Sequence, residues 1–461
     1  MTDSDDTATD SIAADADAGP GETVRRTIEA RTGTDPLRIA RSARERLESG
    51  DPAAGLLLTA LSFEGIVYAL ARYVPEYLGR LGAGPLAIGL FGTVALALPA
   101  LAGFLEAGRA DGTTAVAVPV VAAVGLLTWL VAPTIGSSVG LPAWVVVLVG
   151  VLPLGALAFG RETPLAPWPG SVSTAAGRAD GFGGLAAAGG VLILACLVMA
   201  TGSVGAAFRV VLALGAALGV GLGVLRWAAP DAEGDPSEAD AGDESSSGPR
   251  LPDWRSVLGG LASLPSGYRA LLVGDLFLRV ATGLVSVFTI LVVTRVLSVQ
   301  VSVLGLTLGP SVVFGGLVAV ELLVAGAARA AVRRTGGRFG ADSRLLLAGF
   351  VTALFPLALV SAPATGWVVA ALFGLYGLRD IATAPLTAHL DDALAALPVD
   401  PDGYRRLRDL LVAPSALVGG LLYAGGPVLA FGVATAVGSV ALREFMQFSV
   451  AADAPTRTTA D

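Results

Sequence analysis

Residues 205–226 are GAAFRVVLALGAALGVGLGVLR, and residues 229–252, shortly after them, are APDAEGDPSEADAGDESSSGPRLP. The first stretch predicts a helix that crosses a bilayer, because a spanning helix needs about 20 mostly apolar residues. The second stretch is acidic, rich in Gly, Pro and Ser, and typical of a disordered linker. Apolar runs like the first recur on both sides of the linker. We therefore predict an all-α, polytopic membrane protein.

The composition supports a membrane protein and excludes several classes of function. Of the 461 residues, 54% are hydrophobic and 15% are charged, whereas a soluble domain carries about 25% charged residues. All 30 basic residues are arginine, so the chain contains no phosphate-binding loop that ends in Lys-Ser or Lys-Thr. The single cysteine, Cys196, and the single histidine, His389, exclude an intramolecular disulfide and the usual zinc or haem sites. We expect no enzyme activity, no cofactor and no metal.

About twelve spans are predicted, six before the linker and six after it, in two bundles. They are residues 53–78, 86–105, 114–133, 142–160, 182–201 and 205–226, then 270–294, 303–325, 344–362, 366–383, 404–424 and 428–448. The predicted domains are an acidic and arginine-rich extension at 1–51, a bundle at 52–228, the linker at 229–267, a second bundle at 268–448 and a tail at 449–461.

The arginines predict the orientation, because loops on the cytoplasmic side keep positive charge. If the amino terminus is inside, 25 of the 30 arginines fall in inner segments, and the outer loops hold only Arg80 and Arg295. This distribution predicts an even number of spans in the cytoplasmic membrane, with both termini cytoplasmic. Nineteen of the 38 acidic residues lie in 1–50 and 229–253, and this acidic, lysine-free composition resembles that of proteins from salt-loving archaea.

Two motifs in the second half and a weak internal repeat carry a family resemblance. The tenth span ends in Tyr-Gly-Leu-Arg-Asp (376–380), the eleventh opens with RDLLVAPSALVGG (408–420), and Gly-Ile-Val (65–67) is echoed by Gly-Leu-Val (283–285). Together with the first span (FEGIVYAL, 63–70), the two motifs resemble patterns of the major facilitator superfamily. The resemblance implies two six-helix halves with one substrate pathway between them.

The loop motif that this family carries after the second and eighth spans is degenerate here. Residues 105–112 are LEAGRADG and residues 326–334 are GAARAAVRR, with Ala330 where the family places an aspartate. In the family that aspartate helps to latch the cytoplasmic gate. The resemblance therefore implies that Glu106 and Glu321 take over this role or that gating is altered.

Ionisable residues inside spans are the best functional candidates, because each costs about 2.5 to 3.5 kcal/mol on insertion scales and usually faces a cavity or a partner. Glu64, Tyr68 and Arg72 form one stripe in the first span, and Asp275, Arg279 and Ser286 share a face in the seventh. In one interpretation Glu64 titrates a proton and an arginine anchors an anionic substrate. In the other, Glu64 pairs with Arg72 and Asp275 pairs with Arg279 only to lower the insertion cost.

A second group of charges is expected near the cytoplasmic face. These residues are Glu106, Glu321, Arg379, Asp380, Arg408 and Asp409. We interpret them as inter-helix salt bridges that close an inner gate, with Arg379 and Asp409 as one candidate pair. The alternative is that they are interface charges without a role in gating.

Other single residues favour structural roles. Trp129, Trp144 and Trp367 are expected in an aromatic belt, Cys196 in a buried apolar position and His389 in a cytoplasmic loop. The ridge formed by Gly215, Gly219 and Gly223 favours packing within the bundle over a dimer interface, so we expect a monomer.

The sequence therefore favours a secondary active transporter, a permease that moves a small solute by alternating access and is coupled to H⁺ or Na⁺. The runner-up is a transport-inactive membrane sensor or scaffold, suggested by the degenerate loop motifs and the acidic segments. Beyond the solute and the ion, we expect contact with membrane lipid and none with nucleic acid.

Overall fold

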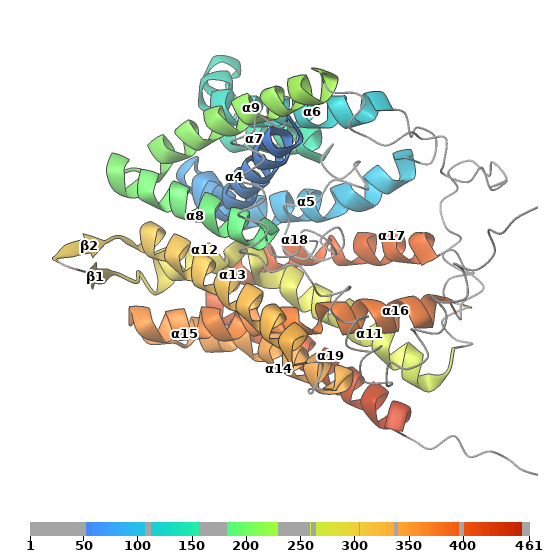
Figure 1. Ribbon diagram of the computed structural model, residues 1–461. Coiled ribbons are helices and arrows are strands. Elements are labelled where there is room, and N and C mark those ends of the chain that lie inside the picture. Colours follow the sequence, from blue (N-terminus) through green and yellow to red (C-terminus); the bar gives the residue numbers. More distant parts are fainter. Residues whose placement is uncertain are drawn as a thin grey trace, which may run out of the picture. The chain divides into compact units, whose positions relative to one another are not determined.

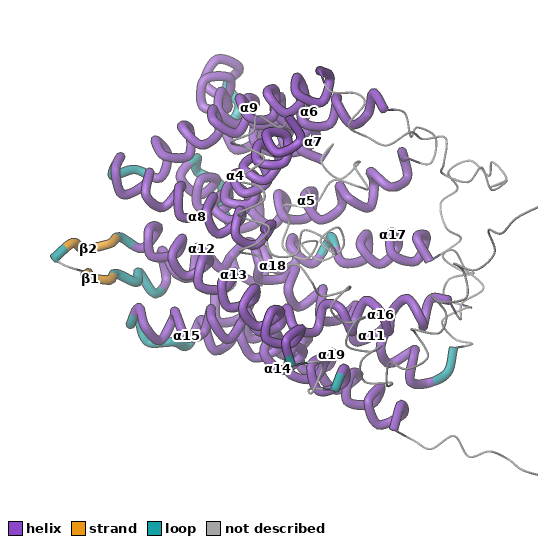
Figure 2. Tube along the Cα trace, viewed as in Figure 1, coloured by secondary structure: helices purple, strands orange, loops and turns teal. Residues whose placement is uncertain are grey.

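The computed structural model describes residues 52–106, 112–155, 182–228, 259, 264–303, 305–335, 340–395 and 401–453. The predicted extension at 1–51, nearly all of the linker at 229–267 and the tail beyond residue 453 lie outside these ranges. The described residues are almost entirely helical (Figure 1). One short β-hairpin interrupts the helices (Figure 2).

The first half contributes six helices, which coincide with the six predicted spans. Three of the turns that join them contain a glycine at positive φ, Gly82, Gly140 and Gly202, because a left-handed backbone conformation carries no steric cost without a Cβ. The helices are α4 (Pro52–Arg80), α5 (Pro85–Glu106), α6 (Gly112–Val139), α7 (Ala143–Leu154), α8 (Phe182–Thr201) and α9 (Val204–Ala228).

The second half supplies the other six spans, several of them as broken helices. The seventh is α11 (Ser266–Val285), η4 (Ser286–Phe288), α12 (Thr289–Leu291) and η5 (Val292–Val296), and the eighth and ninth are α13 (Pro310–Arg334) and α14 (Ala341–Val360). The tenth is α15 (Gly366–Gly377), η6 (Leu378–Ala382) and α16 (Thr383–Ala395), the eleventh is α17 (Pro401–Val412) and α18 (Ser415–Gly425), and the twelfth is α19 (Pro427–Asp453).

Three predictions for the second half are wrong in detail: the start of the eighth span, the end of the tenth span and the loop position of His389. The span at 303–325 begins in an antiparallel hairpin of β1 (Val301–Val303) and β2 (Leu306–Leu308), and its helix starts only at Pro310. Proline suits the first turn of a helix because its missing N–H has no intrahelical acceptor there. The tenth helix continues beyond 383, so His389 lies on α16 and not in a loop.

The helices have the length and apolarity that a membrane requires. Nine of the described helices are long and apolar enough to span a bilayer, and two shorter apolar helices, Pro85–Leu98 and Ala143–Leu154, accompany them. Large apolar side chains such as Leu152, Val224 and Phe350 are exposed on the helix surfaces, as expected where hydrocarbon is the solvent. The prediction of an all-α polytopic membrane protein is confirmed.

Two single-residue predictions are wrong. Trp129 is buried in the core rather than placed in an interfacial belt, and its Nε1 donates a hydrogen bond of 2.8 Å to the carbonyl oxygen of Val147. A buried indole N–H needs such an acceptor. Cys196 is exposed, not buried. Trp367, by contrast, is 76% exposed at the start of α15.

Glycines allow helices to cross closely at equivalent places in the two halves. In the first half, a Cβ at Gly65 of α4 would collide with the carbonyl oxygen of Ala186 in α8, and a Cβ at Gly190 would collide with that of Gly65. In the second half, a Cβ at Gly419 of α18 would collide with the carbonyl oxygen of Leu284 in α11. The first span thus crosses the fifth as the seventh crosses the eleventh, which gives the weak Gly-Ile-Val and Gly-Leu-Val repeat a structural meaning.

Contacts between the halves follow the same pattern. Helix α8 packs on α13, and α5 packs on α18 (Figure 1). These pairs are the fifth span with the eighth and the second with the eleventh, which the duplication relates to each other. A Cβ at Gly89 of α5 would lie 2.6 Å from the carbonyl oxygen of Ala416. The two halves therefore share one continuous hydrophobic core.

Candidate functional site

A cavity of about 420 Å³ lies mainly among helices of the second half. In the second half its walls come from α11, η4, α12, α13, α14, α15, η6, α16, α17 and α19. The first half adds only Tyr68 and Arg72 of α4 and Ala95 and Leu96 of α5. Among the described residues, α7, the fourth predicted span, does not reach the cavity. The two halves therefore share the cavity lining less evenly than the sequence suggested.

The Glu321 cluster, defined as Tyr68, Arg72, Glu321, Tyr376 and Arg379, forms one wall of this cavity. Oε1 of Glu321 accepts hydrogen bonds from Nη2 of Arg72 at 3.2 Å and from Nη2 of Arg379 at 2.9 Å. The Glu321 carboxylate is 3% exposed. Ion pairs with two guanidinium groups offset the cost of desolvating the buried carboxylate. One of these groups, Arg72, belongs to the first half and the other, Arg379, belongs to the second.

Each arginine of the Glu321 cluster also contacts a tyrosine. Nε and Nη2 of Arg72 donate to the Tyr68 hydroxyl at 3.0 and 2.8 Å. The Arg379 guanidinium lies 3.6 Å from the centre of the Tyr376 ring, and that ring stacks on Phe355 with centroids 3.9 Å apart. Stacking on an aromatic face stabilises a cation by roughly 0.5 to 2 kcal/mol, so Tyr376 holds the Arg379 side chain in place.

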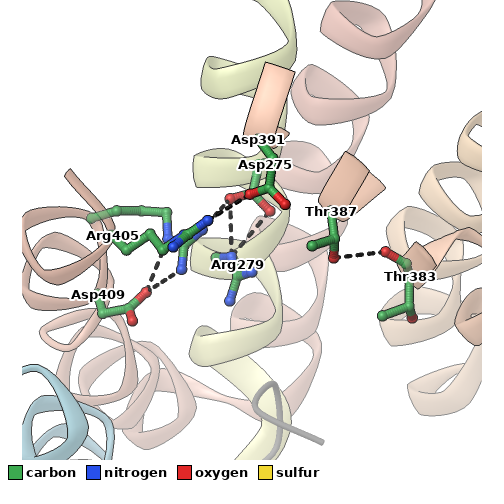
Figure 3. Close-up of polar contacts among 8 residues, drawn as sticks. Asp275, Arg279, Thr383, Thr387, Asp391, Arg405 and Asp409 are labelled. Atoms are coloured by element: carbon green, nitrogen blue, oxygen red, sulfur yellow. Dashed lines mark hydrogen bonds and ion pairs between the residues drawn. The ribbon is translucent and has the colours of Figure 1, made fainter. Parts of the chain in front are cut away.

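The Asp275 cluster, defined as Asp275, Arg279, Arg408 and Asp409, lines the same cavity. Asp275 is 1% exposed and accepts from Nε of Arg279 at 3.0 Å and from Nη1 of Arg408 at 3.0 Å. Arg408 also donates to Asp409 at 2.8 Å. Figure 3 shows Asp275 and Arg279 on one helix, facing the helix that carries Arg405 and Asp409. These pairs join α11 to α17 within the second half.

The structure brings the two groups of sequence candidates together on one cavity. Ten of the twelve candidates line it: Tyr68, Arg72, Asp275, Arg279, Ser286, Glu321, Arg379, Asp380, Arg408 and Asp409. Glu64 is half-buried in α4 and does not line it. Glu106 ends α5, and its side chain lies outside the described residues.

The ion pairs differ from two of those considered in the sequence. Arg72 pairs with Glu321 of the other half and not with Glu64, while Asp275 does pair with Arg279. Arg379 pairs with Glu321 and lies 3.6 Å from Asp380, whereas Asp409 binds its chain neighbour Arg408. The candidate latch between Arg379 and Asp409 is therefore absent from the described ion pairs.

Sequence reasoning missed a third cluster, at the helix ends to which the arginine distribution assigned the outer side. The Glu76 cluster consists of Glu76 and Arg80 of α4 with Thr294 and Arg295 of η5. Oε1 of Glu76 accepts from Arg80 at 3.2 Å, and its Oε2 accepts from Arg295 at 3.3 Å. Glu76 follows Arg72 by one helical turn, so extending the stripe from 64 to 72 by four residues would have found it.

The Glu76 cluster joins the two halves outside the cavity. None of its four residues lines the cavity. Beside it, the Tyr73 hydroxyl donates at 2.7 Å to the carbonyl oxygen of Ser311 in α13. Both contacts join α4 to the second half at this end, and the cavity lining extends to Arg405 and Asp409 of α17.

Comparison with known proteins establishes the fold. No protein-family model and no curated protein sequence matches this chain. Among solved structures, the nucleoside transporter NupG superimposes with a TM-score of 0.57 at 10% identity, over 87% of this chain and 99% of that one. The chain has the fold of a membrane transporter.

Transporters of a second kind superimpose equally well. Tetrameric PepTSo2 gives a TM-score of 0.54 at 15% identity, over 87% of this chain and 97% of its own. The peptide transporter POT in complex with sulfate gives 0.57 at 14% identity, over 86% and 93%. Identities this low support a shared fold alone.

Proposed function

We propose that the protein is a secondary active transporter that moves a small organic solute across the cytoplasmic membrane by alternating access. The observation that carries the proposal is the one-sided cavity. Its polar lining lies towards the end that we assign to the cytoplasm, and the Glu76 cluster holds the halves together at the other end. This arrangement fits an inward-facing member of a two-state equilibrium.

The ion pairs between the halves suggest how access alternates. Arg72 to Glu321 and Glu76 to Arg295 both join α4 to the second half, at successive turns of one helix face. To face outward, the protein must break the pair between Glu76 and Arg295 and close the present cavity. Rigid-body rocking of packed bundles is a known form of such a transition.

Ion coupling is the second part of the proposal. Glu64 is the candidate proton-binding group, because it is a half-buried acid in the first span, one turn before Tyr68, and no described residue forms an ion pair with it. Na⁺ is the alternative coupling ion. We also propose that the protein works as a monomer with both termini in the cytoplasm.

Solute flux tests the function directly. Purified protein in proteoliposomes should accumulate a solute when an inward H⁺ or Na⁺ gradient is imposed, and Arg72→Gln should abolish accumulation while the protein stays folded. Candidate solutes come from a thermal-shift screen, because a ligand that binds only the folded state raises its apparent stability. Absence of flux for every stabilising solute would overturn the proposal in favour of a sensor or scaffold.

A further inference from the structure

The charges around the cavity do not cancel. Its lining includes six arginines and four acids. One of these arginines, Arg405, pairs with Asp391, which is not part of the lining. One positive charge therefore remains uncompensated. The arginine without an acid is Arg329, which forms no ion pair with any described residue and whose buried Nε has no hydrogen-bond partner.

Arg329 and Glu321 lie on the same cavity-facing side of α13. They are two helical turns apart, about 12 Å along the axis, and Ala325 between them also lines the cavity. Arg329 is therefore placed between the Glu321 cluster and the helix end that we assign to the cytoplasm. Arg329 lines the same cavity as the Glu321 cluster and adds its positive charge there.

Arg379 has unused binding capacity. A quarter of its side chain is exposed, compared with 10% for Arg72. Its Nη2 donates to Glu321, its Nε lies 3.6 Å from Asp380, and its Nη1 is buried without a hydrogen-bond partner. A guanidinium presents five N–H donors in a planar fork that suits a carboxylate, and most of those donors on Arg379 are unfilled.

Glu321 can release Arg379 without losing all of its partners. Nη2 of Arg72 also donates to Glu321, at 3.2 Å from Oε1 and 3.4 Å from Oε2. If another carboxylate binds Arg379, Glu321 therefore keeps a charged partner from the first half. The contact between Glu321 and Arg379 is the one that a ligand reaches more readily, because the Arg379 side chain is 25% exposed and the Arg72 side chain is 10% exposed.

The wall beside Arg379 is aromatic. Tyr376 lies between Arg379 and Phe355, and Phe373 meets Phe355 edge to face with centroids 5.5 Å apart. All three aromatic residues line the cavity. Its volume of about 420 Å³ is near the lower end of the roughly 300–1,000 Å³ typical of small-molecule sites.

We propose that the cavity binds a small organic carboxylate carrying a single negative charge and an apolar or aromatic body. The carboxylate takes the place of Glu321 on Arg379, the body packs against the wall formed by Phe355, Phe373 and Tyr376, and Arg329 attracts the anion. This inference names the substrate class of the transporter and rests on the proposed function.

Matched ligand pairs test the class with the unaltered protein. Benzoate against benzamide and hexanoate against hexanamide differ mainly in charge. Titrated into the purified full chain and followed by thermal shift and calorimetry, the two carboxylates should bind at least about tenfold more tightly than the amides, as expected when a charge-assisted bidentate pair is replaced by a neutral contact. Amides that bind as tightly as the acids, or hexylamine that binds more tightly than hexanoate, would overturn the proposal.

Variants test the residues. Arg379→Gln should weaken benzoate binding about tenfold or more, while Arg209→Gln, on the exposed side of α9 and outside the cavity, should leave it unchanged. Glu321→Gln should strengthen benzoate binding, because it removes the competing carboxylate. If Glu321→Gln weakens binding instead, Glu321 is a ligand for a cation and the assignment is wrong. Size-exclusion profiles show that each variant is folded, and Arg379→Lys offers a milder change if Arg379→Gln is not.

Flux measurements separate this inference from the proposed function. Benzoate binding without flux of any solute would leave the anion site intact and refute transport. Flux of a neutral solute that benzoate and hexanoate do not inhibit would leave transport intact and refute the anion site. Phenyl phosphate serves as a further probe, and tighter binding of this dianion than of benzoate would contradict a site with one surplus positive charge.

Discussion

Arg72 of α4 and Glu321 of α13 are 249 positions apart in the sequence, yet Nη2 of the arginine lies 3.2 Å from Oε1 of the glutamate. The pair joins the two halves beside the cavity. One turn further along α4, Glu76 makes the second ion pair between the halves, with Arg295. A single face of the first span therefore holds both of these ion pairs, and any movement of α4 relative to the second half must change both together.

The first prediction concerns the partner of Arg379. A double-mutant cycle that combines Arg379→Met with Glu321→Gln should show a coupling energy of about 1 to 3 kcal/mol in the free energy of unfolding, because residues in one salt-bridge network are not additive. The cycle of Arg379→Met with Asp409→Asn should be additive within about 0.5 kcal/mol. A coupling energy of the same size between Arg379 and Asp409 would instead support the Arg379–Asp409 latch considered from the sequence.

The second prediction concerns the closed end. Arg295→Gln should shift the equilibrium towards the outward-facing state by up to about fivefold, since a partly exposed ion pair contributes about 0 to 1 kcal/mol. In a Cys196→Ser background, a cysteine introduced at Thr289, which lines the cavity, should react faster with an impermeant maleimide from outside. An unchanged labelling rate would show that the Glu76 cluster is not a gate.

Substitutions at two glycines test the role of Arg295 in the same labelling experiment without removing a charge. A Cβ at Gly79 would collide with Nη2 of Arg295, while nothing lies within 4 Å of a Cβ at Gly84. Gly79→Ala should therefore displace Arg295 and increase labelling, and Gly84→Ala should behave like the parent protein. Equal labelling in the two variants would contradict the role of Arg295.

Much of the fold followed from the sequence, because hydrocarbon solvent demands about 20 apolar residues for each spanning helix. The hairpin at 301–308 did not. Its residues are as apolar as a helix, and periodicity cannot separate a short apolar strand from a buried helix. Only Gly305, at φ 80°, marks the turn.

The sequence predicted most residues of the candidate site, but it did not predict which of them form ion pairs with each other. Helical spacing placed Tyr68 and Arg72 on one face, and Arg72 does donate to the Tyr68 hydroxyl. Spacing within a helix cannot indicate which residue of another helix lies opposite, so Glu321 was expected as a gate residue and found as the partner of Arg72. Trp129 was misplaced for the same reason, because its burial depends on α7 and α9 packing around it.

The third prediction tests the close crossing of α4 and α8. Gly190→Ala should lower the free energy of unfolding by about 1 to 3 kcal/mol, the usual cost of overpacking, because its Cβ would collide with the backbone of Gly65. Gly189→Ala, one residue earlier on the same helix, has nothing within 4 Å of its Cβ and should cost nothing. Thermal unfolding in detergent compares them, and equal stability of the two variants would contradict the crossing.

The fourth prediction separates buried from exposed charge in the Asp275 cluster. Asp275→Asn should destabilise the protein by about 3 to 5 kcal/mol, since it leaves the buried Arg408 without its buried partner. Asp409→Asn removes a carboxylate that is 34% exposed and should cost less than about 1 kcal/mol. If thermal unfolding ranks the two variants in the opposite order, Asp409 and not Asp275 holds Arg408.

The last prediction concerns ion coupling. Glu64→Gln keeps the shape of the side chain but cannot exchange a proton, so uptake driven by an inward pH gradient should disappear while exchange of solute at equal pH persists. Glu444→Gln, in α19 and outside the cavity lining, serves as the matched control and should retain both activities. Uptake in proteoliposomes over a range of pH measures the difference. Unchanged pH dependence in Glu64→Gln would rule out Glu64 as the coupling group.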